Sequence, residues 1–248
     1  MDLKDAQKLV KSAESMLEEK GWFVFKSSPK YQEASDLFVK AGNIYKTSKD
    51  FNGAGTCFLR AAECDNLSGE PDEGARKLVI AAGCFKKTDP AQAVEILQKA
   101  VGLFLRAGRF HVAATHEKEI AEIYETQLED LENALVFYER AAERYSGEDS
   151  LATAQKYHLK TAELSAITGN YSKAIEIYEE TARASASNPM LKYSVKEYLL
   201  RAGISHLCNN DIVGARKAIE TYSQIDHSFL GTRESKLLTV HHLIERHI

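Results

Sequence analysis

The chain has 248 residues, with 32 Lys and Arg against 36 Asp and Glu, and its formal net charge is −4. Hydrophobic residues make up 44% of it and charged residues 27%. These proportions are typical of a globular protein with a continuous apolar core. They exclude a disordered chain, a collagen and a strongly basic nucleic-acid binder. The chain has only 4 prolines, which argues against a turn-rich β-sandwich.

The first twenty residues, MDLKDAQKLVKSAESMLEEK, place charged and small apolar residues at helical spacing. This pattern predicts a first helix. The segment has no apolar h-region, so we do not expect a secretory signal. No window of the sequence approaches the roughly 18 consecutive apolar residues of a membrane-spanning helix.

An apolar run interrupts the helical pattern at residues 21–29. Four large apolar residues follow one another there, and such neighbours cannot share one face of a helix. Lysines flank the run, and this make-up suits the membrane interface, where aromatics enter the headgroup layer and lysines meet anionic lipid. The alternative is a buried connection between helices, and the spacing favours neither. The expected membrane-contact residues are Trp22, Phe23, Val24, Phe25 and Lys26.

A repeat of about twenty residues runs through the rest of the chain. In six repeats a second alanine follows the first by seven residues, with a large apolar residue between them. Positions i and i+7 lie on one face of a helix, where alanine lets a neighbouring helix approach closely. The pattern predicts one helix per period and a hairpin of about forty residues per two periods, longer than the roughly 34-residue tetratricopeptide unit. The repeat positions are Ala34, Ala54, Ala75, Ala93, Ala114, Ala134, Ala154, Ala174, Val195 and Ala215.

Helix-ending residues agree with this period. Asp89-Pro90 places a capping Asp before a Pro at the first helical position. Gly169-Asn170 and residues 209–211 predict breaks between later helices. We expect an all-α fold, a right-handed superhelical stack of antiparallel helix hairpins with about twelve helices. This TPR-like α-solenoid would form a single elongated domain over residues 1–248, and the regular breaks exclude a long coiled coil.

No motif in the sequence predicts an enzyme. There is no phosphate-binding loop, no HExxH, no GxSxG and no dinucleotide-binding glycine motif. The adjacent His241 and His242 would point about 100° apart on a helix, and Glu119 and Glu122 indicate a solvated helix face. We therefore expect no catalytic residue, no metal site and no cofactor. An enzyme using the repeat as a frame would need a deep pocket with converging titratable groups.

The cysteines form no CxxC pair and no zinc-type cluster with histidine. We expect reduced thiols that pack as small apolar residues, which favours a cytoplasmic protein. The four cysteines are Cys57, Cys64, Cys84 and Cys208.

Several stretches resemble the alpha-type soluble NSF attachment proteins (SNAPs), where NSF is the ATPase called N-ethylmaleimide-sensitive factor. AGCFKKTDPAQAVEILQKAV, IAEIYET and LKYSVKEY carry the resemblance, which runs in register over essentially the whole chain. It implies a non-enzymatic adaptor that binds SNARE complexes at membranes and links them to the ATPase in vesicle trafficking. It also implies a twisted sheet of antiparallel helices whose exposed apolar loop, at the place of 21–29, contacts the bilayer.

In this family, basic residues of the inner face meet the acidic surface of the SNARE four-helix bundle. Where alpha-type members place a lysine after Gly108-Arg109-Phe110, this chain has Thr115. The expected partners are a syntaxin-type SNARE bundle, the ATPase and an anionic membrane surface, with no nucleic acid and a monomer in isolation. The SNARE-binding residues implied by the resemblance are Lys86, Lys87, Arg109, Lys156, Lys160, Lys192, Tyr193, Lys196 and Arg233.

Family members continue beyond the position of Ile248 with a segment that recruits and stimulates the ATPase. We therefore expect weakened or lost ATPase stimulation, and a chain that could compete with a complete adaptor. Three origins stay open: a trimmed chain, a divergent homologue, or a bacterial mimic acting in the host cytosol. We expect a cytoplasmic protein held peripherally on membranes. The alternative function is a generic helical-repeat scaffold that binds another protein partner.

Overall fold

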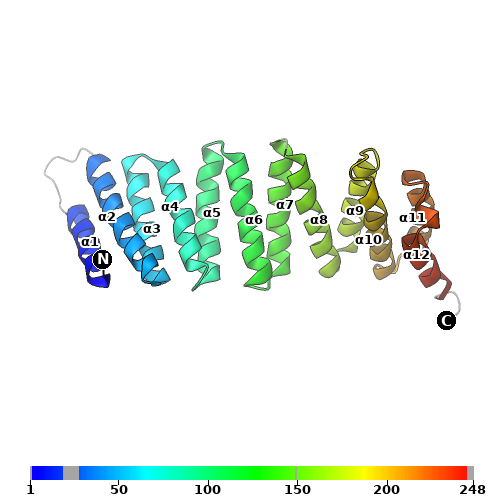
Figure 1. Cartoon of the computed structure of the whole chain (residues 1–248), viewed down its shortest axis with the longest axis horizontal. Helices are drawn as coiled ribbons and strands as arrows, with labels where there is room; N and C mark the ends of the chain where they lie inside the picture. The colour runs from blue at the N-terminus through cyan, green and yellow to red at the C-terminus, as the bar shows by residue number, and fades with distance from the viewer. Residues whose placement is uncertain (1, 19–27, 149, 245–248) are drawn as a thin grey trace. The chain divides into compact units, whose positions relative to one another are not determined.

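The computed structural model describes residues 2–18, 28–148 and 150–244. Within these ranges it has twelve α-helices, two short 3-10 helices and no strand (Figure 1). This confirms the expected all-α fold and the number of helices. The helices are α1 (Leu3–Glu18), α2 (Ser28–Thr47), α3 (Phe51–Ser68), α4 (Pro71–Phe85), α5 (Pro90–Arg106), α6 (Phe110–Thr126), α7 (Leu131–Gly147), α8 (Leu151–Ile167), α9 (Tyr171–Ala186), η1 (Lys192–Ser194), α10 (Val195–Cys208), α11 (Ile212–Ile225), η2 (Phe229–Gly231) and α12 (Arg233–Ile244).

The chain divides into two compact units, Met1–Glu148 with α1 to α7 and Asp149–Ile248 with α8 to α12. Within each unit, consecutive helices pack against one another and run in opposite directions (Figure 1). The antiparallel hairpins are thus as expected. A single domain over the whole chain and a right-handed superhelix stay predictions.

The repeat positions form the contact face of each helix. From α3 to α9, each repeat alanine lies about one turn after the helix begins. Every first-position residue of the repeat is buried, from Ala34 at 0% exposure to Ala215 at 7%, and the second alanines seven residues on are buried too. Because alanine carries only a Cβ, neighbouring helices approach closely along these rows.

Aromatic side chains fill the space between the two alanines of a repeat. Phe38, Phe58 and Tyr138 occupy the same place in three repeats, and all are at most 3% exposed. Burying such side chains contributes about 1.5–3 kcal/mol each. One close helix contact lies at Gly55 in α3, where an added Cβ would sit 2.5 Å from the ring of Phe85 in α4.

A second period, of forty residues, is set by the N-caps. In α3, α5, α7, α9 and α11 the capping carboxylate or amide oxygen accepts a hydrogen bond from the backbone N–H three residues later. Such a cap contributes about 1 kcal/mol. The predicted breaks at Asp89-Pro90, Gly169-Asn170 and 209–211 are confirmed. The capping residues are Asp50, Asp89, Asp130, Asn170 and Asp211.

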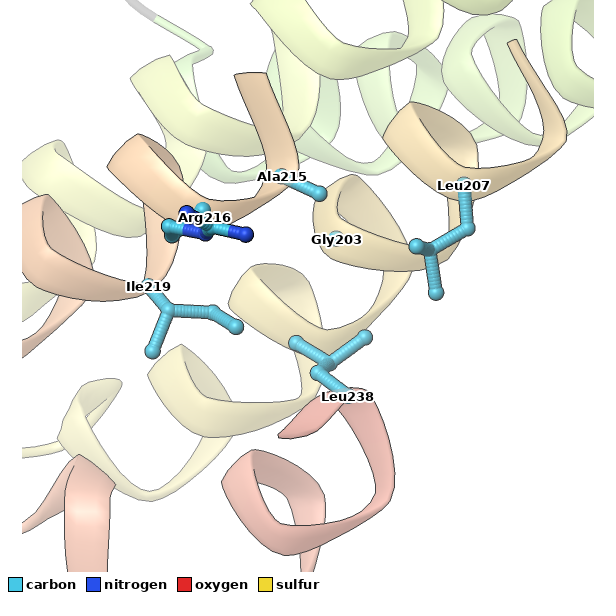
Figure 2. Close-up of a pocket in the computed structure, with 6 residues that line it drawn as sticks. All are labelled: Gly203, Leu207, Ala215, Arg216, Ile219 and Leu238. Carbon is cyan, nitrogen blue, oxygen red and sulfur yellow. The ribbon is translucent and has the colours of Figure 1, made fainter. Parts of the chain in front are cut away.

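The core of the second unit is closed by α12. Leu238 of α12 is 2% exposed and points toward Gly203 of α10, beside Ala215 and Ile219 of α11 (Figure 2). A Cβ at Gly203 would lie 2.5 Å from the Leu238 side chain, so glycine is what lets this leucine pack there. The middle of α12 is thereby fixed beside α10.

Two helical glycines give a matched test of this packing. We expect Gly55→Ala to lower the free energy of unfolding by about 1–3 kcal/mol, because the new methyl would overlap the Phe85 ring. Gly102→Ala, on α5, meets no atom within 4 Å and should raise the same quantity by about 0.5–1 kcal/mol through helix propensity. Urea unfolding followed by circular dichroism measures both. Equal effects of the two substitutions would contradict the packing described.

Candidate functional site

The predicted cations of the first unit lie at its helix ends, and two of them follow α4. The ammonium of Lys86 lies 3.4 Å from Glu119 Oε1 of α6. The ammonium of Lys87 lies 4.0 Å from the centroid of the Phe51 ring, a cation–π distance. Glu119, expected on a solvated face, is instead partly buried and paired, because Lys86 and His116 both reach it. The His116 side chain is the largest cause that lowers the pKa of Glu119, against burial, and Lys86 adds to it.

Arg109 lies elsewhere in the same unit. It is the N-cap residue of α6, and its Nη2 is 2.7 Å from Asp72 Oδ2 at the start of α4. Since α5 begins shortly after Lys87 and ends shortly before Arg109, they lie at opposite ends of a helix about 25 Å long. The structure therefore does not bring Arg109 together with Lys86 and Lys87.

Thr115 occupies the place where the resemblance leads one to expect a lysine. Its hydroxyl donates to the carbonyl of His111 and lies 3.1 Å from the hydroxyl of Tyr145 in α7. The His111 ring contacts the Tyr145 ring edge-on, with centroids 5.3 Å apart. This position thus takes part in the contact between α6 and α7 and contributes no positive charge.

In the second unit, Lys156 and Lys160 are four residues apart on α8 and share one face of that helix. The ammonium of Lys156 lies 5.5 Å from the centroid of the Tyr157 ring. The ammonium of Lys160 lies 3.6 Å from Glu163, one turn farther along. Both contacts are local to α8.

The remaining predicted residues gather where α10 and α12 begin. Lys196 on α10 lies 3.6 Å from Glu234 on α12, and this ion pair places Arg233 beside the start of α10. Lys192 and Tyr193 belong to η1, which leads directly into α10, and Tyr193 is 86% exposed. We call Lys192, Tyr193, Lys196 and Arg233 the basic end of the second unit.

One exposed residue beside this end was missed from the sequence. Met190 precedes η1 and is 88% exposed, two residues from the first lysine of the basic end. An apolar residue at a break between two helices has no periodic pattern around it. Its exposure is therefore visible only in the structure.

Two ion pairs with a buried carboxylate were also missed. Glu117 is 2% exposed and 2.5 Å from Nε of Arg144, and Asp65 is 4% exposed and 2.5 Å from the ammonium of Lys77. The sequence carries a signal for the first pair, since Glu117 falls three residues after Ala114, at a place that other repeats fill with apolar residues. Each pair joins neighbouring helices of the first unit.

Three of the cysteines match their expected place and one does not. Cys57, Cys64 and Cys84 are buried, and burial is the largest cause that raises the pKa of each thiol, to about 11 for Cys57. The prediction was wrong for Cys208, which is exposed because it ends α10.

The described ranges contain no group of three or more His, Cys, Asp and Glu side chains arranged to hold a metal ion. Across the same ranges, no helix combines the length and the apolarity needed to cross a membrane. The predicted membrane-contact residues, Trp22 to Lys26, lie outside the described residues.

Known proteins are similar to this chain along most of its length. The family described as "Soluble NSF attachment protein, SNAP" matches residues 4–245. A Schizosaccharomyces pombe protein described as "Probable vesicular-fusion protein sec17 homolog" is 41% identical over 88% of this chain and 75% of its own length. The Homo sapiens "Alpha-soluble NSF attachment protein" is 36% identical over 99% of this chain and 81% of its own length. The chain therefore belongs to the soluble NSF attachment protein family.

Proposed function

We propose that this protein is a non-enzymatic adaptor that binds assembled SNARE complexes at a membrane and links them to NSF. The observation that carries the proposal is the family match over residues 4–245. The basic end of the second unit supports it, because this surface has the charge needed to meet an acidic helical bundle.

The basic end is the part of the predicted surface best suited to an anionic partner. Within the described ranges, the structure gives no acidic partner for Lys192 or Arg233, and Tyr193 adds an exposed aromatic ring. Each exposed charge contributes only about 0–1 kcal/mol. Several such charges on packed helices add up, because the frame does not have to reorganise on binding.

The cations of the first unit are expected to contribute less. Arg109 already pairs with Asp72, and Lys86 already pairs with Glu119. A SNARE carboxylate would have to compete with these internal partners, so only part of each charge is available. Lys87 lies over the Phe51 ring and is exposed. Of these three cations, we expect Lys87 to contribute most to SNARE binding.

The proposal predicts capture of SNARE complexes and their release by the ATPase. The immobilised chain should retain an assembled SNARE complex, and added NSF with ATP should then separate the SNARE subunits. Gel filtration of the released material measures the second step. The disassembly rate obtained with human alpha-SNAP serves as the reference. Failure to retain the complex would contradict the adaptor proposal and favour a scaffold for another partner.

Charge reversal tests the role of the basic end. The double substitution Lys192→Glu and Lys196→Glu should weaken binding to the SNARE complex about tenfold at low salt and less at high salt. The matched control reverses two cations of α5 outside the predicted set, Lys99→Glu and Arg106→Glu, and should leave the affinity within about twofold. Fluorescence anisotropy with a labelled SNARE bundle measures both. Similar losses from the two pairs would assign binding to net charge alone.

The membrane contact is proposed from the sequence of residues 21–29. Replacing Trp22, Phe23 and Phe25 by Ser should abolish cosedimentation with phosphatidylserine-containing liposomes, because the side chains that enter the headgroup layer are removed. The melting temperature should stay unchanged. A large fall in melting temperature would instead identify these aromatics as part of the core.

A further inference from the structure

A histidine in the second unit lies between two carboxylates. His206 is on α10, and its side chain is only 14% exposed. Its Nδ1 is 3.2 Å from Asp211 Oδ2, in the turn after α10. Its Nε2 is 3.7 Å from Glu179 Oε1, on α9. Both ring nitrogens thus face an anionic oxygen.

This arrangement selects the charged form of the ring. A neutral imidazole has one N–H donor and one nitrogen lone pair. In that form, one ring nitrogen would carry no proton and could not donate a hydrogen bond to the carboxylate that it faces. The imidazolium carries a proton on both nitrogens and can satisfy Asp211 and Glu179 together. The geometry therefore favours protonated His206.

The same two carboxylates hold α11 in place. Asp211 Oδ1 accepts the backbone N–H of Gly214 at 2.8 Å and so caps α11. Glu179 Oε1 accepts the hydroxyl of Tyr222, a fully buried residue of α11, at 2.9 Å. Protonated His206 thus joins α9, the α10–α11 turn and α11 in one network.

Other charged groups act on the two carboxylates more than on the ring. Arg183 of α9 donates to Glu179 Oε2 at 2.6 Å. Lys217 of α11 acts electrostatically on Asp211. Each of these cations favours the ionised form of the carboxylate that it faces.

We propose that α11 is held against α9 and α10 by the proton on His206, and that this contact loosens when that proton is lost as the pH rises. The helix would then be a pH-sensitive element of the fold. The inference does not depend on the proposed SNARE binding.

The directions of the pKa shifts agree with the geometry. Glu179 is the largest cause that raises the pKa of His206 above its ordinary value, burial opposes it, and Asp211 adds to it. A raised histidine pKa gives stability that is complete below about pH 6.5 and is lost as the pH rises through the folded-state value. The pKa values of Glu179 and Asp211 are lowered, so their contributions are lost only in acid.

The test uses the full chain. The His206 ring, followed by NMR, should titrate above pH 6.5, the ordinary value. Hydrogen exchange of the α11 amides, corrected for intrinsic rates, should show protection that falls as the pH rises through the titration of His206. Titration of His206 at or below its ordinary value, or constant protection of α11, would overturn the proposal.

Two glutamine substitutions test whether the His206 ring causes the pH dependence of α11 protection. His206→Gln should remove the pH dependence of α11 protection, and His227→Gln, at an exposed site in the same unit, should retain it. Asp211→Asn keeps a capping side chain and should lower the pKa of His206. If His206→Gln does not fold, the proposal is tested by two measurements on the unmodified chain and on Asp211→Asn. These are the NMR titration of His206 and the hydrogen exchange of the α11 amides. Loss of the pH dependence in His227→Gln would contradict the assignment.

Discussion

Close approach of helices at buried alanines is the constraint on which the rest of the structure depends. A row of alanines about every twenty residues leaves room for the backbone of the next helix, and the aromatic ring between two alanines fills the gap beside it. Neither residue type alone would give this contact, since a larger residue would separate the helices and a smaller ring would leave a cavity. Gly55 and Gly203 extend the same principle to two contacts too close for a Cβ.

Because the alanine rows occupy one face of each helix, the other positions are available for charges. The predicted binding residues lie mainly at helix ends and on outward faces, where substitution does not disturb the stack. The structure nevertheless uses some of these charges internally. Arg109 and Lys86 are partly neutralised by acidic residues two helices away in the chain, whereas the described residues give no acidic partner for Lys192 or Arg233. We therefore expect the second unit to contribute more than the first to the proposed SNARE contact.

The sequence predicts the helices well because their signals are local. The period of the alanines and caps such as Asp89 depend on residues a few positions apart, so the chain reveals them directly. The ion pairs of the candidate site could not be predicted, because their partners are distant in sequence: Asp72 lies 37 residues before Arg109, and Glu119 lies 33 after Lys86. Pairing between nonadjacent helices depends on side-chain reach and on which face each helix presents, and a helical pattern fixes neither.

From family membership and surface charge, we propose that the basic end of the second unit is where a SNARE bundle contacts this protein. Zero-length cross-linking between amines and carboxylates, applied to the complex with an assembled SNARE bundle and read by mass spectrometry, tests it most directly. We expect Lys192 and Lys196 to form cross-links to acidic residues of the bundle, and Lys99 of α5 to form none. Cross-links concentrated on Lys99, with none from the basic end, would contradict it.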